Sequence, residues 1–354
     1  MSGLDQPIVI ANSSYHTGHE RSFLAAEEQG FAREEGLDRY VYLRGGLIPA
    51  QWEGDALGRT MWERGVDISP SVNVWSAIKQ RALGEDVYIV GGWRVQSAPK
   101  LIGARGITRP EQLRGTKSII RERWGMHLGV VLALQTLGVG PDDVEWVEDP
   151  MVAYGAGGAD DLLRSGEISL LSASGPRADA LIHEGFPLVV DLAEFYLQHG
   201  AWPPGRVVVA TRQTIDQRGD DLRAFLRANL RGYWFSIDPR NHAYMHDLET
   251  RCRQATFNED ERKVRRLRDD DAVPAESDPR EFGGSMVMDG LVDRAALAGV
   301  IDGMVKAGQI EAPLTVDDVL KDAASIDACQ RLIDRGLIDR DKVTQWRRAK
   351  GVAS

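Results

Sequence analysis

The richest chemistry in this sequence lies in the polar stretch after its first apolar run. That stretch contains, in order, Asn12, Ser13, Ser14, Tyr15, His16 and His19. An imidazole titrates at about pH 6.5, so His16 or His19 suits general acid or base catalysis at neutral pH. The amide and hydroxyl groups suit hydrogen bonds to a polar ligand, and the Tyr15 ring suits stacking on one. The alternative interpretation is that these residues have no ligand and form a turn that caps the next helix.

Arginine residues after two other apolar runs suit the binding of an acid. Arg44 and Gly45 follow the run at 40–43, whereas Arg121, Arg123 and Trp124 follow the run at 118–120. A guanidinium binds a carboxylate or similar group through two parallel hydrogen bonds. Glycine lets the backbone approach a ligand closely. Solvated surface loops are the alternative interpretation of both segments.

Hydroxyl groups and aromatic rings complete the candidate site. Ser69 and Ser71 follow the run at 66–68 and precede a helix, so one of them can cap that helix while the other binds. Trp93 follows the run at 87–91 and suits the mouth of a binding site. The full set of candidate ligand-binding residues is Asn12, Ser13, Ser14, Tyr15, Arg44, Gly45, Ser69, Ser71, Trp93, Arg121, Arg123, Trp124, Ser172, Ser174 and Tyr196.

Metal and cofactor signatures are missing from the sequence. His16 and His19 have a spacing that a metal accepts, but no carboxylate signature accompanies them. The glycine cluster at 155–158 is not a dinucleotide fingerprint, and no phosphate loop, zinc-protease or serine-hydrolase motif occurs. We therefore expect neither a metal nor a cofactor, and any catalysis would fall to His16 or His19.

Apolar runs alternate with helical patterns over the first two-thirds of the chain. Strands are predicted at 7–11, 40–43, 66–68, 87–91, 100–104, 118–120, 145–147, 169–172, 188–192 and 207–210, with amphipathic segments between most of them. This alternation predicts an α/β protein with mixed, mostly parallel sheets. The last 140 or so residues predict a helical tail.

Composition narrows the class of protein. The chain has 354 residues, 43% hydrophobic and 27% charged, which excludes global disorder and a polytopic membrane protein and suits about two domains. A net charge of −10 argues against nucleic-acid binding. The N-terminus has no apolar export signal, so the sequence as given predicts a cytoplasmic protein; periplasmic or cell-surface location would require a signal that had been removed.

Three segments carry a resemblance to a known family. Residues 24–38 (LAAEEQGFAREEGLD) resemble the first helix of the NMT1/THI5-like family, the nitrate/taurine/sulfonate-type (SsuA-like) solute-binding proteins of ABC transporters. Residues 106–117 (GITRPEQLRGTK) resemble the turn that opens the second lobe of those proteins, and 220–238 resemble a later helix. Gly138-Val139 and Asp142-Asp143-Val144 follow the second segment at the place that the resemblance implies. Together, these matches occur in the family's order over the region from Pro7 to Pro239.

The resemblance implies a type II periplasmic-binding fold with a ligand cleft between two lobes. Lobe I is then expected at 1–95 and 207–354, lobe II at 100–204, and the crossings near 96–100 and 204–208. The ligand lies at the carboxyl ends of the strands in such folds.

Two functions fit these expectations. One is the binding of a small anionic, aromatic or heteroaromatic molecule, with an ABC permease as partner if the protein is exported. The other is a cytosolic enzyme on the same fold, such as a decarboxylase, desulfinase or other lyase. The missing signal favours the enzyme, and the missing catalytic constellation favours the binding protein.

Overall fold

The computed structural model describes residues 6–11, 17–43, 61–95, 98–120, 126–148, 158–173, 175–199, 203–256, 287–306, 308–311 and 314–351. The described residues fall into two compact units. Unit 1 contains those within Met1–Val95, Pro203–Phe257 and Gly283–Ser354, and unit 2 contains those within Gln96–Trp202. Among them, no helix is both long and apolar enough to cross a membrane.

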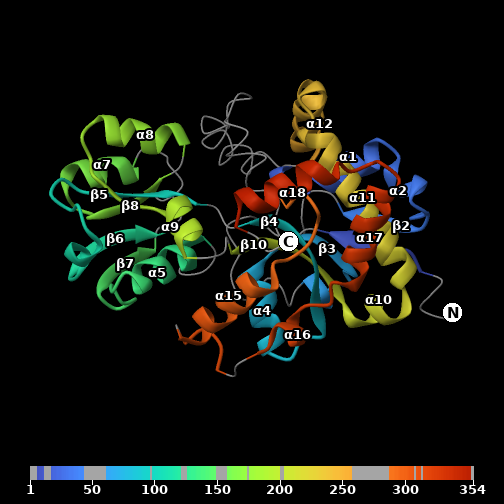
Figure 1. Ribbon diagram of the computed structural model, residues 1–354, viewed down its shortest axis with the longest axis horizontal. Helices are drawn as coiled ribbons and strands as arrows, with labels where there is room; N and C mark the ends of the chain where they lie inside the picture. The colour runs from blue at the N-terminus through green and yellow to red at the C-terminus, as the bar shows by residue number, and fades with distance from the viewer. Residues whose placement is uncertain are drawn as a thin grey trace. The chain divides into compact units, whose positions relative to one another are not determined.

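Unit 1 is built on a five-stranded mixed sheet in the order β2-β1-β3-β10-β4 (Figure 1). The bounds are β1 (Ile8–Ala11), β2 (Tyr40–Leu43), β3 (Ile68–Asn73), β4 (Val87–Val95) and β10 (Pro204–Thr211). β1 is parallel to β2 and β3, whereas β10 runs antiparallel to β3 and β4. The chain therefore inserts unit 2 between β4 and β10, which are neighbours in one sheet.

Helices cover both faces of this sheet. On one face, α1 (Thr17–Glu28), α2 (Phe31–Glu34), α11 (Gly219–Ile237) and α17 (Ala323–Asp334) bury a core that includes Phe23 and Phe225. α4 (Val74–Ala82) contacts β3, β4 and β10, and it also contacts α15 (Arg294–Lys306) and α16 (Val316–Val319). The other elements of unit 1 are α10 (Arg212–Gln217), η4 (Pro239–Asn241), α12 (His242–Thr256) and α18 (Arg340–Ala349).

Unit 2 is a second five-stranded mixed sheet, in the order β7-β6-β8-β5-β9. The strands are β5 (Lys100–Gly103), β6 (Thr116–Ile120), β7 (Val144–Glu148), β8 (Leu170–Ala173) and β9 (Leu188–Asp191). β6 is parallel to β7 and β8, and β5 is antiparallel to β8 and β9. The helices are η3 (Pro110–Leu113), α5 (Met126–Thr136), α7 (Gly158–Ser165), α8 (Gly175–His183) and α9 (Leu192–Gln198).

The turn that resembles the opening of the second lobe is a capped 3₁₀ helix. Gln112 Oε1 accepts hydrogen bonds from the backbone N–H groups of Thr108 and Arg109, at 2.9 and 3.0 Å. The sequence predicts Thr108 as the N-cap with Glu111 closing the box, and this detail is wrong: Arg109 is the N-cap and Gln112 closes it. The amide side chain reaches the two exposed N–H groups that open the turn.

Several element bounds differ from those expected. β3 begins and ends later than the run at 66–68, β4 continues past residue 91 to Val95, and β10 begins at Pro204, so residues 204–208 are strand. The sequence also predicts a helix at 50–64, and this segment lies mostly outside the described residues. β3, β4 and β10 are longer than expected because they form hydrogen bonds with strands that are distant in the sequence. The local sequence pattern does not reveal these pairings.

Candidate functional site

Most of the predicted site residues lie outside the described part of the chain. These are Asn12, Ser13, Ser14, Tyr15, His16, Arg44, Gly45, Arg121, Arg123, Trp124 and Ser174. His19 belongs to α1, but its side chain is not described. Their assigned roles stay predictions. Ser69, Ser71, Trp93, Ser172 and Tyr196 are described and can be placed.

Ser69 and Ser71 lie inside β3, and the prediction that they form a loop after a strand is wrong. They are 0% and 1% exposed, and neither Oγ atom has a hydrogen-bond partner. A buried hydroxyl without a partner costs free energy. A bound solute or water that accepts from these hydroxyls would remove that cost.

β3 passes into α4 without an intervening loop. Asn73 is both the last residue of the strand and the N-cap of the helix, and its Oδ1 accepts from the backbone N–H of Trp75 at 3.1 Å. The cap expected from Ser69 or Ser71 is therefore supplied by Asn73. This leaves both serine hydroxyls available for a ligand.

Trp93 lies within β4 and not in a loop after it. The side chain is 3% exposed, and its Nε1 donates to Ser22 Oγ at 3.2 Å in the core of unit 1. The backbone oxygen of Trp93 accepts from Val287 N at 3.1 Å, so a segment from the C-terminal region runs along this edge strand. The contacts place the indole ring in the core, and its predicted ligand role stays untested.

A small cavity of about 20 Å³ lies beside Trp93 inside unit 1. Its lining includes Asn229 and Tyr233, whose Oδ1 and hydroxyl have no hydrogen-bond partner, and Asp289, whose Oδ2 accepts from Arg347 Nε at 2.6 Å. Burial raises the pKa of Tyr233, and the negative charge of Asp289 raises it further. A volume of this size has room for one water molecule and is too small for an organic solute.

Ser172 and Tyr196 belong to unit 2. Ser172 is a partly buried residue inside β8, opposite Leu101 of β5. Tyr196 lies on α9, whose first turn is capped by Asp191 Oδ1 accepting from Ala193 N at 2.9 Å. Tyr196 is 6% exposed, and burial raises the pKa of its hydroxyl. The phenol is therefore neutral at physiological pH and serves as a hydrogen-bonding group.

Two arginines that the sequence analysis did not select lie side by side in unit 1. Arg94 of β4 and Arg206 of β10 are directly opposite each other in the antiparallel ladder. Arg206 Nη1 donates to the backbone oxygen of Ser71 at 3.3 Å, which ties the pair to the buried serines. Arg94 follows one apolar run and Arg206 precedes another, and each lies next to a crossing between the units. This position was the available sequence signal.

Burial and a like charge both act on the guanidinium of Arg94. Desolvation lowers the pKa of Arg94 to about 10, and the neighbouring charge of Arg206 contributes to the shift. Both effects penalise the charged guanidinium, which still remains protonated at neutral pH.

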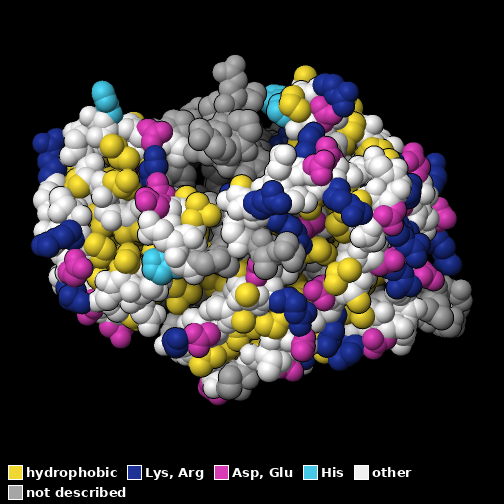
Figure 2. All heavy atoms as spheres, viewed as in Figure 1, with side chains coloured by type: hydrophobic (Ala, Val, Ile, Leu, Met, Phe, Trp, Pro, Cys, Tyr) yellow, Lys and Arg dark blue, Asp and Glu magenta, His cyan; other side chains and the backbone are white. Residues whose placement is uncertain are grey.

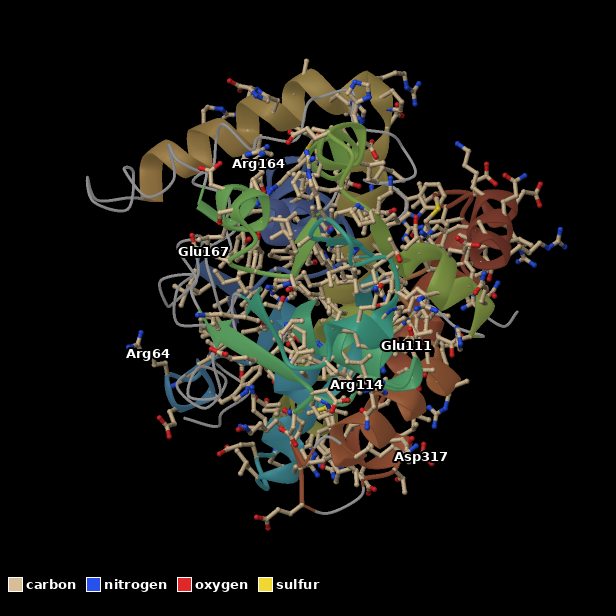
Figure 3. All side chains as sticks on the ribbon, turned by 90° about the vertical axis from the view of Figure 1, so that its left-hand side faces the viewer. Arg64, Glu111, Arg114, Arg164, Glu167 and Asp317 are labelled. Atoms are coloured by element: carbon tan, nitrogen blue, oxygen red, sulfur yellow. The ribbon has the colours of Figure 1, made fainter. Side chains whose placement is uncertain are left out.

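Arginines at the surface of unit 2 are mostly paired with acids. Arg164, labelled in Figure 3 on α7, donates from Nη2 to Glu184 Oε1 at 2.8 Å, and Arg177 donates to Asp160 at 2.5 Å. Arg114 donates from Nε to Asp143 at 3.3 Å. On the face drawn in Figure 2, basic and acidic side chains are interspersed. The described surface pairs therefore suit solvation more than ligand binding.

Metal-ligating side chains do not cluster in the described part of the chain. Within it, no group of three or more His, Cys, Asp or Glu residues has the arrangement that holds a metal ion. In unit 1, the guanidinium of Arg206 contacts the backbone oxygen of Ser71, whose own hydroxyl has no hydrogen-bond partner. Guanidinium and hydroxyl groups can both donate to an oxyanion.

Known structures with the same fold include sulfonate-binding proteins. No protein-family model matches the sequence, and no curated protein matches it significantly. The periplasmic sulfonate-binding protein SsuA of Methylobacillus flagellatus KT is 16% identical with a TM-score of 0.65, over 94% of this chain and 96% of that one. SsuA of Xanthomonas axonopodis pv. citri bound to MOPS is 12% identical with a TM-score of 0.57, over 90% and 98%.

An enzyme shares this fold as well. The desulfurization enzyme DSZB, as a variant in complex with biphenyl-2-sulfinic acid, is 15% identical with a TM-score of 0.54, over 92% of this chain and 99% of that one. At these identities the likeness shows the fold alone. The chain has the two-lobed α/β fold of SsuA-like solute-binding proteins, and the predicted fold class and resemblance are confirmed at that level.

Proposed function

We propose that this protein binds a small organic anion as an ABC-type solute-binding protein. The observation that carries the proposal is the pair of buried hydroxyls without partners, Ser69 and Ser71, beside the guanidinium of Arg206 in an SsuA-like fold. Hydroxyl and guanidinium donors match an oxyanion, which is acceptor-only when ionised. An aromatic or heteroaromatic body on the anion fits the predicted roles of Tyr15 and Trp124.

The fold relatives give the proposed ligand a chemical class. One holds MOPS, which is an organic sulfonate, and another holds biphenyl-2-sulfinic acid. Both molecules join an organic ring to a charged sulfur oxyacid. We propose the same class for this protein, with organic carboxylates as weaker ligands.

A thermal-shift panel tests the proposal. Benzenesulfonate, MOPS, benzenesulfinate and benzoate are compared with benzenesulfonamide, which has a similar shape and no charge. A ligand at a hundredfold excess over its Kd should raise the free energy of unfolding by about 2.7 kcal/mol, and the melting temperature should rise with concentration. Equal stabilisation by the neutral sulfonamide, or no stabilisation by any anion, would contradict the proposal.

The proposed partner and location follow from the same role. A solute-binding protein delivers its ligand to an ABC permease, and it does so outside the cytoplasmic membrane. We propose this partner for an exported form of the protein, whereas a cytoplasmic form would favour the enzyme. Fractionation of native cells with an antibody to the chain separates the two locations.

An enzyme on the same fold is the second candidate, because DSZB shares it over nearly the whole chain. The proposed chemistry is the cleavage of a carboxylate or sulfinate group from an aromatic acid, with His16 or His19 as general acid or base. Cys329 does not supply a thiolate: it is 6% exposed, and burial raises the pKa of its thiol to about 12, with a further contribution from Asp289.

Mass spectrometry after long incubation distinguishes enzyme from binding protein. An enzyme should convert a ligand found in the panel, and His16→Gln or His19→Gln should lower that rate about 10²–10⁴-fold without abolishing binding. We expect an unchanged ligand and near-normal binding by both variants. Turnover that depends on either imidazole would replace the binding function with the enzymatic one.

A further inference from the structure

The small cavity beside Trp93 has polar walls supplied by distant parts of the chain. Its volume is about 20 Å³, and one water molecule needs about 10–15 Å³ on the same measure. Its polar lining residues are Ser22 of α1, Trp93 of β4, Asn229 and Tyr233 of α11, Asp289 before α15, and Ser325 of α17. None of them is more than 6% exposed. Unit 1 therefore holds one small interior space among side chains that form hydrogen bonds.

Two of these side chains have a polar atom that the described part of the chain does not satisfy. Neither Asn229 Oδ1 nor the Tyr233 hydroxyl has a hydrogen-bond partner there. The two residues are four positions apart on α11, so they lie on one face of the helix, a turn apart. A buried polar group without a partner is destabilising. A single molecule in the cavity satisfies both groups if it donates to an amide oxygen and also bonds to a hydroxyl.

The charge around the cavity favours a neutral occupant. Asp289 Oδ2 accepts from Arg347 Nε at 2.6 Å, and Asp289 Oδ1 accepts from the backbone N–H of Leu291 at 3.0 Å. This buried carboxylate would repel an anion, and it already has a cationic partner. Burial and the negative charge of Asp289 both raise the pKa of Tyr233, so its hydroxyl keeps its proton and can donate.

We propose that the cavity binds one water molecule, which donates to Asn229 Oδ1 and accepts from the Tyr233 hydroxyl. Its second hydrogen bonds to the carboxylate of Asp289, which lines the same cavity. Buried waters typically form about three hydrogen bonds, and these three groups supply them. The inference is independent of the proposed function, so either can fail without the other.

The water connects the segment at 287–291 to α11. Main-chain atoms already attach this segment to its neighbours: Val287 N donates to Trp93 O at 3.1 Å, and Gly92 N donates to Gly290 O at 2.8 Å. Asp289 adds a side-chain contact through Arg347, which belongs to α18. With the water in place, hydrogen bonds run from α11 through Asp289 to the last helix of the chain.

A high-resolution crystal structure of the whole protein tests the occupant directly. We expect one ordered water whose oxygen lies about 2.7–3.2 Å from both the Tyr233 hydroxyl oxygen and Asn229 Oδ1. No ordered density between these atoms, or an ion in their place, would overturn the proposal. The double variant Tyr233→Phe, Asn229→Leu should lose the water, because apolar walls do not hold one. Water that stays in the double variant would overturn the role of these two residues.

Urea denaturation of Tyr233→Phe tests the hydrogen bond by the sign of its effect. If the hydroxyl donates to a water, the variant loses that bond, and its unfolding equilibrium constant should rise by about two- to tenfold. If the hydroxyl has no partner, the variant loses only an unpaired buried group, and the constant should stay the same or fall. The second result would contradict the proposal.

Tyr244→Phe is the matched control. Tyr244 of α12 is partly buried, its ring centre lies 5.8 Å from that of Phe235, and it does not line the cavity. The same loss of a hydroxyl should change its unfolding equilibrium constant by less than about twofold. A rise of equal size in Tyr244→Phe and Tyr233→Phe would show that the effect does not come from the cavity, and the proposal would fall.

Discussion

Replacing Glu35 by Ala should lower the free energy of unfolding by about 3–5 kcal/mol, because it leaves buried arginine charges without their partner. Glu35 follows α2, and its side chain is 2% exposed. Its carboxylate accepts from Arg227 Nε at 2.8 Å and Arg231 Nη1 at 2.7 Å, both on α11, and from Arg335 Nη1 at 2.8 Å, directly after α17. One carboxylate thus joins three helical segments of unit 1.

The pH dependence of this contribution has a definite sign. Burial by itself would raise the pKa of Glu35, but hydrogen bonds from Arg335, Arg227 and Arg231 outweigh it and hold the pKa below its ordinary value of 4.5. A carboxyl with a depressed pKa in the folded state adds stability above its unfolded pKa and loses it as pH falls through the folded value. The difference between the unchanged protein and Glu35→Gln should therefore shrink below about pH 4.

Urea denaturation at neutral and acid pH measures both effects, and Glu34 supplies the control. Glu34 is 58% exposed and contacts Arg231 Nη2 at 2.6 Å, so Glu34→Ala should cost about 0–1 kcal/mol. If Glu34→Ala and Glu35→Ala lower the free energy of unfolding equally at neutral pH, the ion pairs of Glu35 contribute no more stability than a surface ion pair.

Replacing Gly232 by Ala should destabilise unit 1 by about 3 kcal/mol or more. A Cβ atom at this position of α11 would lie 1.9 Å from the backbone oxygen of Ser22 and 2.7 Å from the backbone nitrogen of Ala26, both on α1. Neither backbone can move alone, so the two helices must separate. Overpacking of this kind costs about 1–3 kcal/mol and occasionally more.

The separation would reach the core and the neighbouring cavity. Phe23 of α1 and Phe225 of α11 have ring centres 4.9 Å apart, and Ser22 Oγ accepts from Trp93 Nε1. Loss of these contacts should lower the melting temperature and expose Trp93 to a fluorescence quencher. An unchanged melting temperature would mean that the two helices do not pack as closely as described.

Gly299→Ala is the matched control for this substitution. Gly299 lies in α15 with nothing within 4 Å of an added Cβ. Alanine there reduces the entropy of the unfolded chain and favours helix, so the variant should be about 0.5–1 kcal/mol more stable. If Gly232→Ala lowers the free energy of unfolding and Gly299→Ala raises it, the steric contact at Gly232 is the cause of the destabilisation.

Prediction of the site from the sequence depended on finding where each strand ends. β3 has the sequence ISPSVN, with two serines and a proline, and such a composition is typical of a loop. Proline is tolerated in this strand because β1 pairs with β3 only at Ile68, so from Pro70 onward no bond to β1 depends on the missing N–H. Pairing with β10 then keeps Asn73 and Val72 extended.

The sequence by itself determined the alternation of strands and helices, the α/β class and the resemblance to SsuA-like proteins. These are set by local side-chain periodicity and by turn residues such as Gly106 and Gly138, whose positive φ values suit glycine. Apolar residues must be buried in any fold of this chain, so their spacing along it is informative without knowledge of the partner segments.

Only the tertiary structure decided which charges meet. Arg94 and Arg206 are opposite each other because unit 2 is inserted between β4 and β10, and Glu35 meets Arg227 and Arg335 because α11 and α17 lie beside α2. A charged side chain has the same local pattern whether it is solvated, paired or opposed to a like charge. Its energy depends on the charges and the burial around it, and those are supplied by segments far away in the sequence.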